Sequence, residues 1–162
     1  MTPVVLVDKL IKRIRLAVSH FRLQTDIEDA PWRAPQVVGG FLNSKRPATE
    51  DGTLRGLDPV PLFPYVNVRY LEDDGNKAIV KIIAGAYSTD GQSGWRDCMN
   101  VLIRIKQALQ EQQFFGAFSI DPVMKTQMPE EQASPEWTAS LTLSVTIPQT
   151  LIERTDVTDG IT

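Results

Sequence analysis

Cysteine and histidine are almost absent from the sequence. Its 162 residues include one cysteine, Cys98, and one histidine, His20. A single cysteine cannot form an intrachain disulfide, so the chain carries no sign of an oxidising compartment. A structural zinc site takes four cysteine or histidine ligands, and a catalytic one usually takes three protein ligands. The two counts therefore argue against a His/Cys metal site within one chain, and we expect neither a metal nor another cofactor.

Long apolar runs and excess positive charge are also missing. No run approaches the ~18 to 20 apolar residues that span a bilayer. The start of the chain mixes charges with apolar side chains, unlike the continuous apolar region of a signal peptide. The net charge is −3 and the pI is about 5.2, whereas domains that grip DNA are more often basic. We expect no membrane segment, no secretion and no broad nucleic-acid surface.

Two segments have the apolar spacing of amphipathic helices. Steps of three and four predict one helix over residues 4–23 and a second from about residue 93 to residue 113. His20 lies near the end of the first helix, where a structural role is expected. The two apolar stripes are Val4, Val7, Ile11, Ile14, Val18 and Phe21 in the first helix, and Trp95, Cys98, Met99, Leu102, Ile105 and Leu109 in the second.

The strands are predicted from alternation and turn chemistry. Residues 65–71 and 77–87 read as a hairpin joined through an Asp-Gly turn. A third strand is predicted in AFSIDPVM, and WTASLTLSVTI alternates throughout, so one of its faces is core and the other is lined by hydroxyls. The order helix, hairpin, helix, hairpin predicts one α+β domain over residues 1–148, with two helices on one side of a mainly antiparallel four-stranded sheet.

Two segments lack periodicity. Residues 26–63 form a long Pro-rich excursion with a possible short strand in PQVVGGFLN, and residues 149–162 form a tail. Loops longer than ~12 to 15 residues are usually functional or disordered. Residues 43–58 are therefore either a simple surface loop or a segment that orders against a neighbour. The tail is expected to be mobile when alone or ordered at an interface.

The sequence motifs give little support for an enzyme. The Gly-rich loop from Gly85 to Gly94 lacks the spacing of a Walker loop and contains no lysine. Its glycines suit a turn, with Ser93 as the N-cap of the second helix. No G-x-S-x-G elbow accompanies His20, and Cys98 lies on an apolar helix face where a buried, inert thiol is expected. We expect a protein that is not an enzyme.

The element order and several segments resemble the tail terminator (tail completion) proteins of long-tailed bacteriophages. The likeness covers residues 4–148. It is carried by the amphipathic first helix, the hairpin in LFPYVNVRYLEDDGNKAIVKIIAGAYSTDG, the helix GWRDCMNVLIRIKQALQEQ and the closing strand EWTASLTLSVTIP. The path from the central strand into the second helix, AYSTDGQSGWRDCMNVLIRI, is the part most like that family.

The resemblance implies a structural virion protein that assembles in the host cytoplasm and acts in the tail or neck. Such a protein forms a ring, commonly a homohexamer, that caps the tail tube, stops its polymerisation and provides the head-joining interface. Its partners would be further copies of itself, the tail tube protein and the head connector or neck proteins. DNA would pass through the lumen without specific binding.

Ring formation uses two different patches of one subunit, and long loops and tails can supply them. The candidate segments are residues 43–58, residues 125–136 and the tail from Gln149. Two alternatives stay open: another neck protein, such as a head-completion protein or head-tail adaptor, and a small-ligand or nucleotide-binding enzyme that uses the Gly85–Gly94 loop. The candidate interface residues are Lys45, Arg46, Glu50, Asp51, Arg55, Lys125, Glu130 and Glu131.

Overall fold

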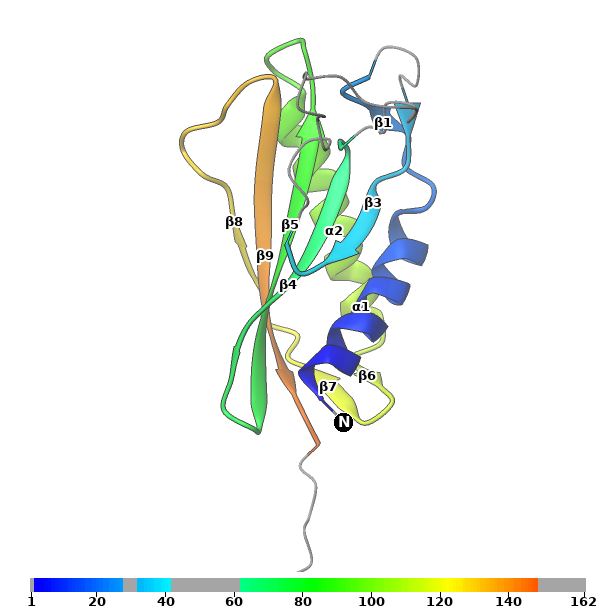
Figure 1. Ribbon diagram of the computed structural model, residues 1–162, viewed down its shortest axis with the longest axis vertical. Coiled ribbons are helices and arrows are strands. Elements are labelled where there is room, and N and C mark those ends of the chain that lie inside the picture. Colours follow the sequence, from blue (N-terminus) through cyan, green and yellow to red (C-terminus); the bar gives the residue numbers. More distant parts are fainter. Residues whose placement is uncertain (1, 28–31, 42–61, 149–162) are drawn as a thin grey trace, which may run out of the picture.

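The structure is a computed structural model that describes residues 2–27, 32–41 and 62–148. Within these ranges the chain forms two helices and a curled, mixed sheet of seven strands (Figure 1). The helices are α1 (Pro3–Val18) and α2 (Gly94–Glu111). Both lie at positions where the apolar spacing predicts a helix.

Helix α1 begins and ends earlier than its predicted range. The Thr2 side chain accepts a hydrogen bond from the Val5 amide at 3.3 Å, and Pro3 follows at the first helical position, so the start has ordinary capping chemistry. The helix ends at Val18 because the chain turns at Ser19, whose amide donates to the Leu16 carbonyl. The predicted last turn, residues 19–23, is therefore not helical.

The central strands run side by side in the order β3-β4-β5-β9-β7-β6, and β8 also pairs with β9. Strand β3 is parallel to β4, and every other pair in this sheet is antiparallel. A separate pair consists of β1 (Leu23–Gln24) and β2 (Trp32–Arg33). The strands of the large sheet are β3 (Gln36–Gly39), β4 (Tyr65–Asp73), β5 (Lys77–Tyr87), β6 (Phe114–Phe115), β7 (Phe118–Ile120), β8 (Lys125–Gln127) and β9 (Glu136–Thr146).

The predicted four-stranded, mainly antiparallel sheet in the order helix, hairpin, helix, hairpin is therefore wrong. Strand β3 joins the sheet edge in parallel, with the Gln36 amide donating to the Pro64 carbonyl and the Gly40 amide to the Val68 carbonyl. Strand β8 lies in residues 125–136, where no strand was predicted, and β6 follows the predicted end of the second helix at residue 113. Strand β3 pairs with residues 29 positions away, which local periodicity does not reveal, and β6 forms a short hairpin with β7.

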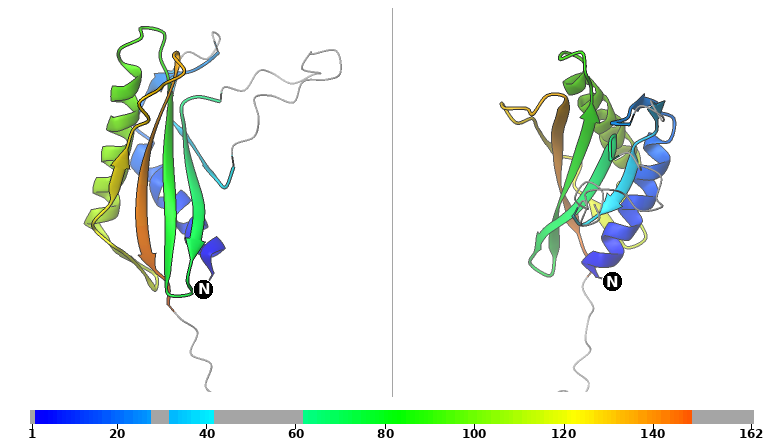
Figure 2. Two further views of the ribbon diagram at one scale, coloured as in Figure 1. Left: turned by 90° about the vertical axis from the view of Figure 1, so that its left-hand side faces the viewer. Right: turned by 45° about the horizontal axis from the view of Figure 1, so that its top comes forward.

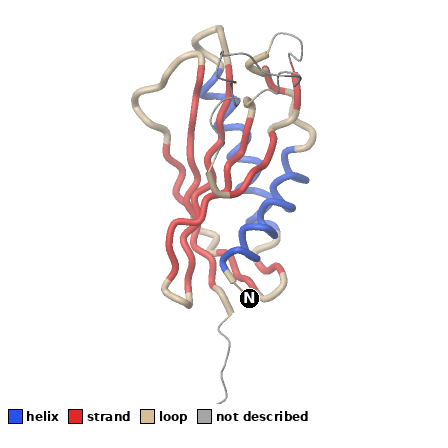
Figure 3. The backbone as a smooth tube through the Cα atoms, viewed as in Figure 1, coloured by secondary structure: helices blue, strands red, loops and turns tan. Residues whose placement is uncertain are grey.

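The core lies between the two helices and one face of the sheet. Helix α1 packs against β3, β4 and α2, and α2 packs against β5 and β9. Figures 2 and 3 show the sheet curling around this helical layer. Burial of the apolar side chains of this core supplies the main favourable free energy of folding. The largest fully buried side chains are Phe118, Leu6, Leu10, Ile14, Ile82, Leu102, Ile105, Leu109, Ile120, Leu141, Leu143 and Val18.

Candidate functional site

An open groove lies where the first half of α1 meets the ends of β3 and β4. It has a volume of about 720 Å³ and is mostly apolar. Its floor depends on a glycine, because a Cβ at Gly39 would lie 2.8 Å from the Ile11 Cδ1 atom and 3.3 Å from a Val7 methyl carbon. Strand β3 can therefore approach α1 closely only at this small residue. The lining is completed by Pro3, Val4, Asp8, Gly40, Phe41, Arg69 and Tyr70.

The rim of this groove exposes large apolar side chains. Val4 is 69% exposed, Phe41 is 79% exposed, and Tyr70 is also exposed. The Arg69 guanidinium lies 4.7 Å from the centre of the Phe41 ring, and its Nε donates to the Gly40 carbonyl at 3.3 Å. The cation thus holds Phe41 against the sheet edge through a cation–π contact. The arrangement suits contact with another apolar surface.

Tyr70, which lines the groove, contacts a carboxylate on the same hairpin. The Tyr70 hydroxyl donates to Asp73, and this hydrogen bond raises the pKa of Tyr70. Asp73 also accepts from the Gly75 amide at 3.0 Å. Neither group is paired with a nucleophile or with a base that could activate one.

The second open surface is the face of the sheet opposite the helices. On β9 the residues Leu141, Leu143 and Val145 are buried on the helix side, as the alternation predicts. Thr142, Ser144 and Thr146 point to the other side. Ser140 shares that side but is buried. The hydroxyl-lined face predicted for this strand is thus open over its second half.

An aromatic cluster covers one end of this open face. The ring of Phe63 lies 5.1 Å from that of Tyr65 and 6.1 Å from that of Tyr87, measured between centroids. The Tyr65 ring lies directly over Gly85 on the neighbouring strand, where a Cβ would come within 2.1 Å of it. Burial raises the pKa of Tyr65. Gly85 therefore serves close packing against an aromatic ring.

The loop after β5 is filled by its own carboxylate. Asp90 accepts hydrogen bonds from the Gln92 and Ser93 amides at 2.8 and 2.7 Å, and from the Ser88 and Ser93 hydroxyls. These donors hold the pKa of Asp90 far below its ordinary value, with the Ser93 hydroxyl contributing most. Gly91 has a φ of 74°, as a turn requires. A phosphate placed in this loop would meet the Asp90 negative charge.

Ser93 does precede α2, but its role differs from the predicted one. Its side chain caps no helix amide; it donates instead to Asp90. The Asp90 carboxylate accepts from the Gln92 and Ser93 amides, which directly precede the helix, and so fixes the turn that leads into α2. The signal that could have found it is an Asp three residues before the N-cap position, with glycine between them.

Cys98 and His20 belong to residue types that often act in catalysis, but their surroundings do not prepare them for it. Cys98 is 1% exposed, its thiol donates to the Trp137 carbonyl at 3.4 Å, and burial raises its pKa to about 12. Such a thiol is inert at neutral pH. His20 is exposed and stacks on Phe21 with ring centres 4.6 Å apart. In the described part of the chain, no three His, Cys, Asp or Glu side chains gather as a metal site would need.

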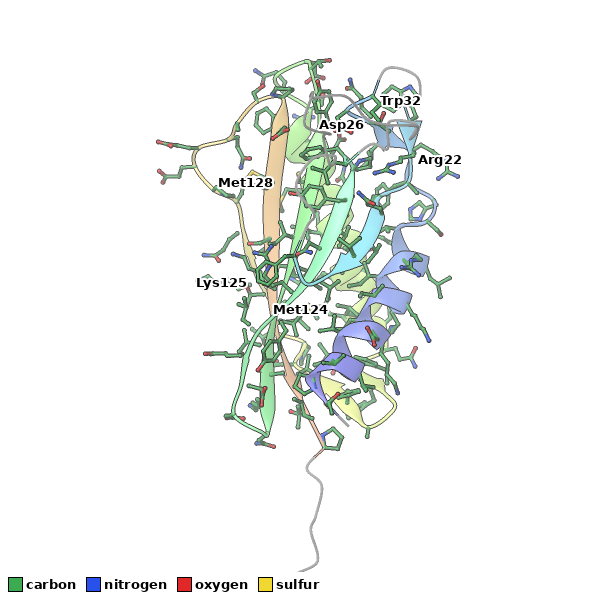
Figure 4. The ribbon with its side chains drawn as sticks, in the orientation of Figure 1. Arg22, Asp26, Trp32, Met124, Lys125 and Met128 are labelled. Atoms are coloured by element: carbon green, nitrogen blue, oxygen red, sulfur yellow. The ribbon has the colours of Figure 1, made fainter. Side chains whose placement is uncertain are left out.

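Three of the predicted interface residues can be placed. Lys125, labelled in Figure 4, lies on β8 opposite Thr142. Glu130 and Glu131 lie in the connection from β8 to β9. All three are exposed, but the structure gives no contact that joins the lysine to either glutamate. Lys45, Arg46, Glu50, Asp51 and Arg55 lie outside the described residues, as does the tail.

The groove itself was missed by sequence reasoning. Val4 was assigned to the apolar stripe of a core helix, and Phe41 to a possible strand end. The usable signal was that apolar residues at 4, 5, 6 and 7 exceed what one helix face can bury.

Comparison with models of known protein families found no match, and comparison with curated proteins found none either. Separately, neither helix within the described ranges is long and apolar enough to cross a membrane.

Proposed function

We propose that the chain is a structural virion protein of the phage tail-terminator type. It assembles with further copies of itself into a ring, with six subunits as the expected number, on the end of the tail tube. The ring stops tube polymerisation and presents the surface that joins the tail to the head connector. Assembly takes place in the host cytoplasm, and DNA passes through the lumen without specific binding.

The observation that carries this proposal is the open apolar groove between α1 and the β3–β4 edge. Monomeric soluble proteins rarely leave large contiguous apolar patches in water, and such patches commonly mark protein contacts. Val4 and Phe41 stand exposed at the rim of the groove. A partner that covers them removes apolar surface from water and so favours association.

A second feature favours assembly over catalysis. Among the described residues that line the groove, Asp8 and Arg69 are the two charged ones, and Arg69 contacts Phe41 and Gly40. Closed rings form when one patch of a subunit binds a different patch of the next. The groove and the open sheet face are two such different patches on one subunit.

A capping assay tests the proposal. Purified tail tube protein is polymerised with and without the full chain, and tube lengths are measured by negative-stain imaging. We expect rings at tube ends and tubes that stop growing. Tubes of unaltered length with no terminal ring would overturn the proposal. In infected cells lacking the chain, overlong tails support a terminator, whereas tails of normal length that fail to join heads identify an adaptor instead.

A further inference from the structure

A row of basic side chains crosses the open face of the sheet. Arg69 of β4 pairs with Lys81 of β5, Lys81 pairs with Thr142 of β9, and Thr142 pairs with Lys125 of β8. Directly paired residues in antiparallel strands share a face, so the three cations lie side by side on one surface. Three strand spacings separate Arg69 from Lys125, or about 14 Å. We call Arg69, Lys81 and Lys125 the basic row.

Within the described residues, the basic row has no acidic partner: none of the three cations forms an ion pair with a carboxylate there. The Arg69 guanidinium donates to the Gly40 carbonyl and lies over the Phe41 ring. Like charges placed directly opposite each other destabilise a sheet. An unpaired row of this kind is therefore suited to an anionic partner that comes from outside the subunit.

Acidic side chains gather at the end of the same sheet. Glu72, Asp73 and Asp74 lie at the turn between β4 and β5 and line a hollow of about 320 Å³ with Lys77 and Ile79. The β4–β5 hairpin extends well past the end of β3 (Figure 1). Asp73 and Asp74 accept hydrogen bonds from turn amides, whereas the Glu72 side chain forms none within the described residues. We call Glu72, Asp73 and Asp74 the acidic turn.

The position of the acidic turn argues against a nucleic acid as the partner of the basic row. Glu72 pairs with Ile79, and the backbone of Ile79 lies about 7 Å along β5 from that of Lys81. A long polyphosphate that continued past the row would run over these carboxylates and be repelled, and the chain as a whole carries a charge of −3. A short acidic protrusion contacts the row without extending over them.

We propose that the acidic turn of one copy of this chain binds the basic row of a second copy. The two surfaces have opposite charge. Lys125 and the three acidic side chains are exposed, and Arg69 and Lys81 are partly exposed. This inference rests on the self-assembly step of the proposed function and adds an ionic contact to the apolar contact expected at the groove. The partner is thus a second copy, and the contact is an ionic one that depends on salt.

Charge reversal in the full chain tests the contact. Lys81→Glu replaces the central cation of the basic row with a carboxylate, and Glu72→Lys replaces one of the three carboxylates of the acidic turn with a cation without removing a hydrogen bond that shapes the turn. Each single variant places like charges against each other in self-association. In an equimolar mixture of the two, every contact between unlike chains is again between opposite charges. Lys12→Glu, on the exposed side of α1, is the matched control for the change of charge.

Association is measured by sedimentation velocity, and circular dichroism verifies folding of each variant. We expect the wild-type chain and Lys12→Glu to associate at low salt, and to lose that association near 1 M NaCl, where the Debye length is about 3 Å. Each single reversal should weaken association by about tenfold or more. The mixture, and a chain with both reversals, should recover it.

Several results would overturn the contact: a wild-type chain that stays monomeric, single reversals that associate normally, or a mixture that does not recover. If Lys81→Glu associates normally but no longer retains duplex DNA, the row belongs to a nucleic acid. Other outcomes would contradict the proposed function while leaving the contact intact. Charge-dependent association that ends at a dimer, or that leaves tube growth unchanged, supports the contact and counts against the terminator ring.

Discussion

Arg69 of β4 lies directly opposite Lys81 of β5 on the sheet face that neither helix covers. The two cations share this face with Lys125, and no carboxylate within the described residues forms an ion pair with them. A pair of like charges lowers the stability of the isolated subunit. We therefore expect another interaction to offset this loss of stability. The contact with a second copy supplies one, because it would place carboxylates against the row.

A first prediction concerns this pair in the isolated subunit. Lys81→Glu should raise the free energy of unfolding by roughly 0.2–1 kcal/mol, because a like-charge pair becomes an opposite-charge pair. The melting temperature should rise by up to about 4 °C. Thermal unfolding of dilute protein measures the effect, and high salt should remove it. A melting temperature that falls would show that Lys81 is stabilised by contacts of another kind.

A second prediction concerns the close packing of Tyr65 on Gly85. Gly85→Ala places a Cβ about where the ring lies, 2.1 Å from its Cε2 atom, so overpacking should destabilise the fold by about 1–3 kcal/mol. Adding Tyr65→Ala removes the clash. In a denaturant double-mutant cycle, the alanine at position 85 should therefore cost much less in the Tyr65→Ala background. Equal costs in both backgrounds would contradict the packing described.

These local features show what the sequence could predict. The hairpin of β4 and β5 follows from strand alternation on both sides of an Asp-Gly turn, and β9 follows from its unbroken alternation. In the hairpin, each strand lies close in sequence to its partner. In β9, the alternating pattern is long. Periodicity is a local signal, and it was sufficient there.

The short strands required contacts that the sequence does not reveal. Strand β3 pairs with residues more than 25 positions away, and its parallel direction depends on that distant partner. Strand β8 is exposed at all three residues, so it has no apolar pattern to detect. The prediction of which side of α1 is buried was also wrong, since Val4 is exposed whereas Leu6 is fully buried. Helix α1 has apolar residues on several sides, so steps of three and four fit more than one apolar stripe.

A third prediction concerns Asp90 and pH. Because the folded-state pKa of Asp90 is depressed below its ordinary value of 3.8, the carboxylate contributes stability that is present above that value. This contribution is lost as the pH falls from about 4 towards the lower folded-state pKa. The difference in melting temperature between wild type and Asp90→Asn should therefore shrink as the solution is acidified below pH 4. A difference that grows in acid would contradict the assigned sign.

A fourth prediction concerns Asn67, which is fully buried on β4. Its side-chain oxygen and nitrogen have no hydrogen-bond partner among the described residues. An unsatisfied buried amide costs about 1–3 kcal/mol. Asn67→Leu, with the same number of side-chain heavy atoms, should therefore raise the free energy of unfolding by about 1 kcal/mol in urea unfolding. Asn100→Leu on the exposed side of α2 is the control and should change it little.

The groove at α1 provides the most direct test of the proposed assembly role. Phe41 and Phe114 are similarly exposed, at 79% and 70%, but only Phe41 belongs to the groove. Substituting an exposed side chain changes stability by roughly 0.5 kcal/mol or less, so Phe41→Ser and Phe114→Ser should both fold normally. If the groove is buried on assembly, Phe41 is an aromatic anchor whose loss weakens binding by about tenfold or more.

The two serine variants are compared in the tube-capping assay by the protein concentration that halves tube growth. We expect this concentration to rise by about tenfold or more for Phe41→Ser and to stay near the wild-type value for Phe114→Ser. Val4→Ser, on the opposite rim of the groove, should behave like Phe41→Ser because both side chains would face the same partner. Equal capping by all three variants would remove the groove from the assembly surface, since no apolar rim residue would then contribute to binding.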